Sequence, residues 1–255
     1  MSKCQDQGAR NVLVGGGTGF IGSHLFLKGL PKDTVAVVNL AGQNVMDFKR
    51  RWTAGFRQNV YNSRINTTAS LAKSINKAQN KPSVFVAISG VGAYKPDKLK
   101  EYTEESTCEE FDFFSKLCKK WEAAASLNNE SNSHCRIVTI RSGVVLGGPV
   151  GDGSQYMPWI HVEDLTNLIM FAIENPKVKG ILNGVAPKTL HLEKALNRPA
   201  IFPLPTVVLD ILLSKERAIM ITDGQKVLPK RTQSVGFKYK YPDIESACRG
   251  IVNSS

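Results

Sequence analysis

The chain has 255 residues, of which 42% are hydrophobic and 22% are charged, and its formal net charge is +11 at pH 7. This composition can bury the core of one large α/β domain, alone or with a small appendage. The longest apolar runs, such as Thr206–Leu213, are far shorter than the roughly 20 residues of a membrane span, and Met1–Arg10 lacks a signal peptide's apolar core. We therefore expect a soluble protein without a membrane partner, cytoplasmic by default, with the mitochondrion and the nucleus as alternatives.

The positive charge and the cysteines point to no macromolecular or metal ligand. Lysines cluster only weakly, along Lys116–Lys120 and from Lys226 to Lys240, and no DNA- or RNA-binding motif accompanies them. We expect solvated faces and no nucleic-acid partner, with the charge favouring anionic small ligands. The five cysteines form no CxxC pair and show no metal-ligand spacing, so we expect free thiols and no metal site.

The first predicted unit carries the strongest local signal. A strand over Asn11–Val14 runs into the glycine-rich turn Gly15–Gly22, and a helix follows over Phe20–Leu30. Glycines let the chain turn tightly and bring backbone N–H groups close to a pyrophosphate, which also faces the positive end of the helix dipole. The order of strand, turn and helix therefore predicts a dinucleotide-binding turn, with a glycine turn without ligand as the alternative.

Further predicted strands and helices alternate up to about residue 156. The strands are rich in β-branched residues and are expected to be buried on both faces, whereas the helices carry apolar residues at helical spacing. The strands are Thr34–Leu40, Ser83–Ser89 and Arg136–Arg141, and the helices are Phe56–Asn76 and Phe111–Ser126. This alternation predicts an α/β fold with a Rossmann-like, doubly wound parallel sheet.

The pattern changes from about Met157. A helix over Val162–Glu174, a strand over Gly180–Val185 and a helical stretch over Thr206–Lys215 are predicted there. We expect residues 1–156 to form an NAD(P)-binding domain and residues 157–255 to form a small C-terminal lobe that closes over the cofactor.

One expected part of the dinucleotide fingerprint is missing. The fingerprint requires an acidic residue about 20 positions after the turn for the ribose hydroxyls, or a basic residue for a 2′-phosphate. The next strand follows Asp33 and runs into Asn39–Gly42, so neither charge stands at its carboxyl end. We therefore expect the sheet to lack one early, adenosine-binding strand, which makes Val12–Val14 a sheet edge with unpaired backbone groups.

Several motifs occur together in this chain. They are GGGTGFIG at Gly15–Gly22, VNLAGQN at Val38–Asn44, Ser63-Arg64, RSGVVLG at Arg141–Gly147, PWIHVED at Pro158–Asp164, and GQKVLPKR at Gly224–Arg231, followed by GFKY from Gly236 and by Tyr241-Pro. The set resembles the atypical, epimerase-like branch of the extended short-chain dehydrogenase/reductase superfamily, which is described as NADP-dependent oxidoreductases. The resemblance covers Asn11 to Val252, and three blocks are missing relative to the family, after about Leu30, between Leu146 and Gly148, and after Pro187.

The resemblance implies NADP as the cofactor, with NAD as the alternative, and a small-molecule substrate. Carried over position by position, the family's cofactor contacts are Gly16, Thr18, Gly19, Phe20, Ile21, Gly22, Leu40, Ala41, Asn59, Arg64 and Val145. The planar guanidinium of Arg64 can pair with a phosphate, and a surface salt bridge is the alternative for this residue.

The catalytic residues stay unassigned. The superfamily uses a Tyr as acid/base, a Lys four residues later and a Ser or Thr that binds the substrate oxygen. Alignment on Trp121-Glu122 places Phe114 at the Tyr position and Cys118 at the Lys position. The same counting places Gly90 at the Ser position. Substitutes that the chain offers are the phenol of Tyr94, the hydroxyl of Ser89 and the thiol of Cys118, each of which also fits a packed structural residue.

Other catalytic signatures find no support. His161 and Asp164 stand at the start of the predicted helix Val162–Glu174. We expect both to have structural roles, and Asp164 to stabilise the first turn of the helix through its dipole. The sequence contains no HExxH motif, no paired carboxylates and no nucleophile elbow. Metallohydrolase and acyl-transfer chemistry therefore have no support.

We predict an NADP-dependent oxidoreductase or epimerase of the extended short-chain dehydrogenase superfamily that transfers hydride to or from an unknown small substrate. The alternative is a non-catalytic dinucleotide-binding protein, a sensor or scaffold, because Gly90, Phe114 and Cys118 occupy the catalytic positions. The sequence identifies neither the substrate nor the oligomeric state.

Overall fold

A central parallel sheet organises the molecule. The computed structural model describes residues 12–28, 36–45, 47, 50–127, 135–146, 156–188, 190–191, 217 and 224–253. The sheet has five parallel strands in the order β1-β2-β3-β5-β9. Their bounds are β1 Val12–Gly15, β2 Ala36–Asn39, β3 Val84–Gly90, β5 Arg136–Ser142 and β9 Gly180–Gly184. All five strands were predicted, and the α/β fold class is confirmed.

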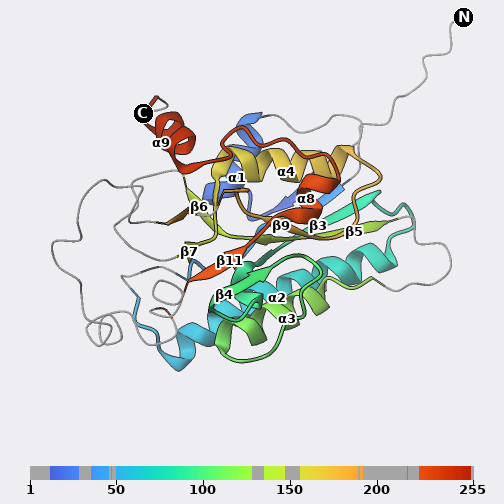
Figure 1. Ribbon diagram of the computed structural model, residues 1–255. Helices are drawn as coiled ribbons and strands as arrows, with labels where there is room; N and C mark the ends of the chain where they lie inside the picture. The colour runs from blue at the N-terminus through green and yellow to red at the C-terminus, as the bar shows by residue number, and fades with distance from the viewer. Residues whose placement is uncertain are drawn as a thin grey trace, which may run out of the picture.

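Helices cover both faces of this sheet (Figure 1). The helices α1 (Phe20–Lys28) and α4 (Val162–Glu174) lie on one face, and α2 (Ala54–Lys77) and α3 (Phe113–Ala124) lie on the other. Along each strand, alternate residues face opposite helix layers. Thus Val38 packs into the core with α1 and α4, whereas Val37 packs against α2. The four helices confirm the predicted positions, and the result is a three-layer α/β/α arrangement.

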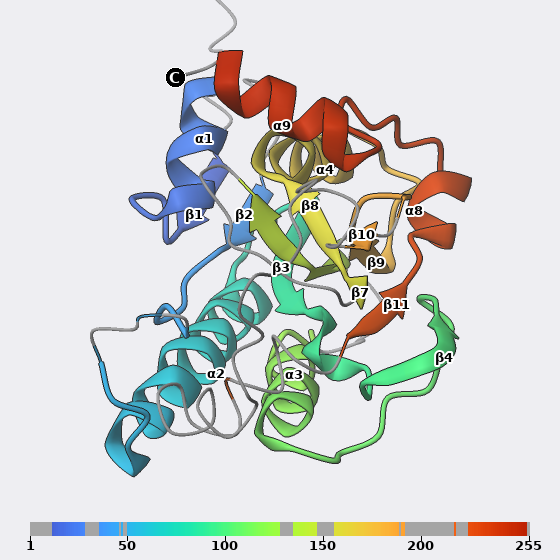
Figure 2. The same ribbon diagram turned by 60° about the vertical axis from the view of Figure 1, so that its left-hand side comes forward.

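Smaller elements lie around this core (Figure 2). Three pairs of short strands occur there, together with a 3₁₀ turn and two C-terminal helices. They are β4 Asp97–Tyr102 with β11 Gln225–Val227, β6 Val144–Leu146 with β8 Trp159–His161, β7 Tyr156–Met157 with β10 Leu190–His191, η1 Val91–Ala93, α8 Lys230–Ser234 and α9 Ile244–Asn253. The predicted helical stretch Thr206–Lys215 lies outside the described residues.

Strand β1 forms one edge of the described sheet, since it pairs with β2 alone. Leu13, in the middle of β1, leaves 57% of its surface exposed. The expectation that every strand is buried on both faces is therefore wrong for β1, although β2 is buried along its whole length. The edge position agrees with the predicted lack of an adenosine-side strand. It also explains why Leu13 is exposed, because no strand of the described part lies beyond β1 with a helix that would cover the Leu13 side chain.

The predicted division between residues 156 and 157 stays a prediction. Both α4 and β9 follow this boundary in the chain, yet α4 packs into the main core and β9 is the last strand of the central sheet. None of the described helices combines the length and apolarity required to cross a bilayer. Within the described ranges, no three His, Cys, Asp or Glu side chains gather as a metal-binding group.

Candidate functional site

The glycine-rich turn lies against the segment that follows β2. Gly16 has a φ of 79°, and a Cβ built on it would lie 2.8 Å from the backbone N of Ala41 and the carbonyl carbon of Leu40. A Cβ on Gly22, in the first turns of α1, would lie 2.5 Å from the carbonyl O of Gly16. Both positions therefore require glycine, one for close approach to Leu40–Ala41 and the other for close packing of helix against turn.

The start of α1 completes this turn. The backbone N–H of Gly19 donates to the carbonyl O of Gly16 at 3.1 Å, and the helix begins at Phe20, which is 48% exposed. Thr18 and Gly19 are also exposed. The predicted cofactor residues from Gly16 to Gly22 thus form one turn and helix N-terminus, exposed at Thr18–Phe20, which lies next to predicted Leu40 and Ala41. Such an N-terminus favours an anion.

A buried amide holds the Leu40–Ala41 segment in place. Asn39 is fully buried, its Oδ1 accepts the backbone N–H of Ala41 at 3.2 Å, and its Nδ2 donates to Thr68 Oγ1 at 2.8 Å. Thr68 Oγ1 in turn accepts from Trp121 Nε1 at 2.9 Å. Asn39 was not among the predicted site residues, although an Asn that ends a β-branched strand is a signal that could have identified it.

Arg64, on α2, lies at the carboxyl end of β2. A Cβ built on Gly42 would lie 2.9 Å from Arg64 Cζ, so the guanidinium fills the space that this glycine leaves. Its Nη1 donates to the carbonyl O of Gln43 at 2.9 Å, and its Cζ lies 5.1 Å from the ring centroid of Trp121. Burial lowers the pKa of Arg64 to about 10, so the group stays charged at neutral pH. No acidic side chain of the described residues pairs with Arg64, so the alternative of a surface salt bridge has no support in this part of the chain.

The other two predicted cofactor residues lie on α2 and β6. Asn59 is exposed on α2, five residues before Arg64, which places it about 140° around the helix from that residue. Val145 lies on β6, opposite Ile160 of β8, and is partly buried against the main core. The structure therefore does not bring Asn59 to the face of α2 that carries Arg64, and the roles of both residues stay predictions.

The side chains suggested as catalytic substitutes are packed. Tyr94 is fully buried, and its Oη donates to Asn183 Oδ1 at 2.9 Å and accepts from Arg141 Nη1 at 3.0 Å. Burial raises the pKa of Tyr94 despite the nearby Arg141 cation. Cys118 is buried, its Sγ donates to the carbonyl O of Gly90 at 3.5 Å, and burial raises its pKa to about 12. Neither group is an accessible base at neutral pH.

A buried ion pair lies behind the predicted catalytic positions. Glu122 on α3 binds Arg141 on β5 at two points, each 2.8 Å long, and also accepts the hydroxyl of Ser89 at 2.8 Å. Burial by itself would lower the pKa of Arg141, but the Glu122 carboxylate raises it by a larger amount. The pKa of Arg141 therefore lies above its ordinary value. Ser89 therefore serves this network, which the sequence had not revealed because its members come from three separate elements.

Glu104 attaches the C-terminal elements to the sheet. Its carboxylate is buried and accepts the backbone N–H groups of Arg231 (3.0 Å) and Thr232 (3.2 Å), at the start of α8. It also accepts the backbone N–H of Asn183 in β9 at 3.1 Å. The N-cap residue of α8, Pro229, has no side-chain acceptor, so Glu104 caps this helix from a distant part of the chain.

The helix predicted at Val162 has the expected structural start. His161 Nδ1 accepts the backbone N–H of Glu163 at 3.2 Å and thereby caps α4. Asp164 is fully buried and accepts the backbone N–H groups of Lys240 (2.7 Å) and Tyr241 (2.8 Å). Asp164 thus joins α4 to the C-terminal segment rather than acting through the helix dipole alone.

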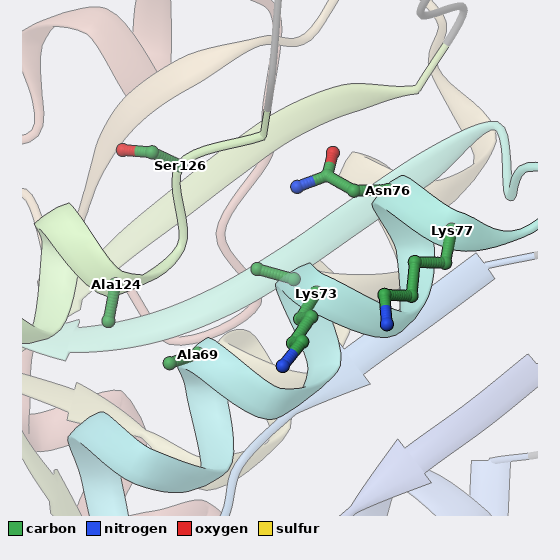
Figure 3. Close-up of a pocket in the computed structure, with 7 residues that line it drawn as sticks. Ala69, Lys73, Asn76, Lys77, Ala124 and Ser126 are labelled. Carbon is green, nitrogen blue, oxygen red and sulfur yellow. The ribbon is translucent and has the colours of Figure 1, made fainter.

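A separate hollow of about 410 Å³ opens between the C-terminal ends of α2 and α3 (Figure 3). Its lining residues are small or polar, namely Ala69, Ala72, Lys73, Asn76, Lys77, Ala124 and Ser126. Since helices run antiparallel to the strands they connect, these ends lie near the amino ends of the strands, opposite the glycine turn. The hollow contains no predicted site residue.

Known proteins resemble this chain over most of its length. It is 41% identical to the epimerase family protein SDR39U1 of Bos taurus, over 295 residues that cover 94% of this chain and 99% of the relative. A crystal structure of human epimerase family protein SDR39U1 (isoform 2) with NADPH matches with a TM-score of 0.86 and 38% identity, over 96% of this chain and 99% of that chain.

Two further matches concern the fold and the C-terminal part. A short-chain dehydrogenase/reductase superfamily protein from Agrobacterium tumefaciens with bound NAD shares the fold, with a TM-score of 0.69 at 12% identity over 95% of this chain and 96% of that chain. A family model described as a domain of unknown function, DUF1731, matches residues 204–251.

The aligned length bears on the predicted missing blocks. The alignment with the bovine relative spans 295 residues, more than the 255 of this chain, so that relative contains stretches that this chain lacks. Where these stretches fall stays a prediction. With this identity over nearly the full length of both proteins, the predicted resemblance is confirmed, and the chain belongs to the SDR39U1 epimerase family within the short-chain dehydrogenase/reductase fold.

Proposed function

We propose that this chain binds NADP(H), with NADH as a weaker or equal alternative, where the turn Gly16–Gly22 meets Leu40–Ala41. The observation that carries the proposal is the approach of Gly16 to this segment, where even a methyl group would come within 2.8 Å of backbone atoms. The exposed N-terminus of α1 supplies N–H groups and a positive dipole for the pyrophosphate. The NADPH in the human family member's crystal structure supports the same ligand here.

Arg64 adds a fixed positive charge to this proposed site. Its guanidinium is held by the carbonyl O of Gln43 and by the ring of Trp121, and Gly42 leaves room for it. A desolvated cation is costly unless it is paired, and Arg64 has no acidic partner in the described part of the chain. We assign it to the negatively charged or hydroxyl-bearing part of the bound dinucleotide.

The reaction that we propose is hydride exchange with a small-molecule carbonyl or hydroxyl substrate. The nicotinamide ring, when bound, supplies or accepts the hydride. The chain itself binds and orients the cofactor and keeps water from the packed region around Phe114 and Cys118. We also propose a cytoplasmic location and no nucleic-acid partner.

A non-catalytic sensor or scaffold is the second candidate. The observation that favours it is the packing of Tyr94 and Cys118, which leaves neither a phenol nor a thiol free to move a proton. A protein of this kind would bind the dinucleotide without turnover.

Calorimetric titration with NADPH and, separately, NADH tests the binding site. The wild-type chain should bind one equivalent, and Gly16→Ala should lose at least about tenfold in affinity, because positive φ and backbone contact oppose a Cβ there. Gly55→Ala is the matched control, since a Cβ at that position meets nothing closer than 4.0 Å. No binding by a folded wild-type sample would overturn the proposal.

Turnover separates the two candidates. NADPH oxidation with a panel of aldehydes, ketones and keto sugars should be followed at saturating cofactor. Oxidation that depends on one substrate class supports the enzyme, whereas tight binding without oxidation by any panel member supports the sensor.

A further inference from the structure

An aromatic cluster lies beside the predicted catalytic positions, where the residues before α2 meet the start of α3. The ring centroid of Trp52 lies 5.5 Å from that of Phe56, 5.4 Å from that of Phe113 and 5.8 Å from that of Phe114. Phe114 is the residue that stands at the superfamily's Tyr position. The cluster therefore borders the place where the substrate is expected.

Arg217 covers this cluster. It belongs to the residues matched by the DUF1731 model and is only 2% exposed. Its Cζ lies 4.7 Å from the ring centroid of Trp52 and 5.1 Å from that of Phe56. Such cation–π contacts are attractive when the cation is desolvated. A cation from the C-terminal module is thus buried against the nucleotide-binding part of the molecule.

Only some of the hydrogen-bond donors of Arg217 and Trp52 have an acceptor. Arg217 donates from Nη1 to the carbonyl O of Arg50 at 2.9 Å and from Nη2 to that of Asp47 at 3.3 Å. In contrast, Arg217 Nε and Trp52 Nε1 are buried and have no hydrogen-bond partner. A buried donor without an acceptor lowers the stability of the folded protein by about 1–3 kcal/mol. Such donors are therefore rare in native proteins, and each one calls for an explanation. Two such donors on side chains in contact point to a shared acceptor.

The surrounding charge specifies the kind of acceptor. Between Arg50 and Arg57 the residues Arg50, Arg51 and Arg57 are basic and none is acidic, and they outnumber Asp47, whose carboxylate interacts with Arg217. Helix α2 begins at Ala54, two residues after Trp52, and its N-terminus adds positive potential. An anion is therefore favoured over a neutral carbonyl oxygen.

We infer that Arg217 and Trp52 form a binding site for an oxyanion, a carboxylate or phosphate group of the substrate. Arg217 Nε–H and Trp52 Nε1–H donate to its oxygens, and the aromatic cluster places the rest of the molecule beside Phe114. The inference rests on the proposed function, since it names the substrate class of the proposed reaction. It also gives the C-terminal module a role in selecting substrates that carry a negative charge.

Calorimetric titration of the full chain with inorganic phosphate and, separately, acetate tests this site, with sodium chloride holding the ionic strength constant. Trp52→Phe keeps an aromatic ring but removes Nε1–H, and it should weaken anion binding about tenfold, as expected for a hydrogen bond to a charged group. Lys188→Gln is the matched control, because its side chain is 71% exposed, pairs with Asp243 on the surface and belongs to no part of the aromatic cluster, so binding should change less than about twofold.

The NADPH titration of the same samples separates this inference from the proposed function. Trp52→Phe should keep its NADPH affinity, and Gly16→Ala should lose NADPH but keep the anion. Binding of phosphate alone would restrict the substrate to phosphate esters, and binding of both anions would include carboxylates. No anion binding by a wild-type chain that binds NADPH would overturn the inference, as would equal weakening by Lys188→Gln and Trp52→Phe.

Discussion

Glu122 holds Arg141 through two parallel hydrogen bonds, from Nε to Oε1 and from Nη2 to Oε2, each 2.8 Å long. The side chain of Arg141 is 5% exposed and that of Glu122 is 17% exposed. This pair joins α3 to β5 directly behind the segment Ser89–Gly90, so it positions the end of β3 as well as neutralising a buried cation.

Glu122→Gln should destabilise the protein by about 3 kcal/mol, near the lower end of the range for breaking a buried ion pair, because Arg141 is left uncompensated while part of Glu122 reaches solvent. Urea denaturation followed by circular dichroism measures this loss. The matched control is Glu110→Gln, which removes the exposed pair with Lys119 and should cost less than about 1 kcal/mol. Equal losses for both variants would contradict a stabilising role for the buried pair.

Cys118 should resist alkylation in the folded state. Its pKa of about 12 leaves about 10⁵-fold less thiolate than thiol at pH 7, and its side chain is buried. Cys248 on α9 is exposed and should react with iodoacetamide first. Mass spectrometry of peptides from native and urea-unfolded samples measures both rates. Rapid modification of Cys118 in the native protein would show that the thiol is an accessible nucleophile.

The same raised pKa makes stability depend on alkaline pH. In the unfolded chain the Cys118 thiol has its ordinary pKa of 9.0, whereas burial raises the pKa to about 12 in the folded chain. Proton release therefore favours unfolding as pH rises above 9, and the contribution is intact below that value. Cys118→Ala should show a smaller loss of unfolding free energy between pH 8 and pH 10 than the wild type, measured by urea titration at each pH. An identical slope in both proteins would argue against the buried thiol.

Leu13 should promote self-association through the open edge of β1. Leu13→Thr places a β-branched residue on the strand and removes exposed apolar surface, so it should lower the fraction of aggregate in light scattering after mild heating. Leu99→Thr is the control, because Leu99 is 93% exposed but lies on β4, outside the central sheet. Equal effects would assign aggregation to exposed leucine in general.

The protein without ligand should melt at a low temperature, because the sheet ends at β1 in the described part and its side chains there are only partly covered. NADPH at 100 times its dissociation constant should add about 2.7 kcal/mol and raise the melting temperature. Differential scanning calorimetry measures both quantities. A cooperative melt at high temperature without ligand would refute the prediction.

Local pattern was enough to predict the five strands and four helices of the α/β/α core. Runs such as Ser83–Ser89 combine β-branched residues with turn signals at both ends, and the Gly15–Gly22 motif restricts the backbone through its glycines alone. The short strands β4 (DKLKEY) and β11 (QKV) were missed, because polar runs of this kind carry neither alternation nor sufficient length.

The sequence by itself determined the layer order and the dinucleotide turn, since each depends on residues that are neighbours along the chain. Only the tertiary structure decided which polar groups meet: Glu104 with Thr232, 128 residues apart, and Arg217 with the carbonyl of Arg50, 167 residues apart. The physical reason is that periodicity reports which face of an element is buried, whereas the partner of a buried charge is chosen by the packing of elements that are distant in the chain.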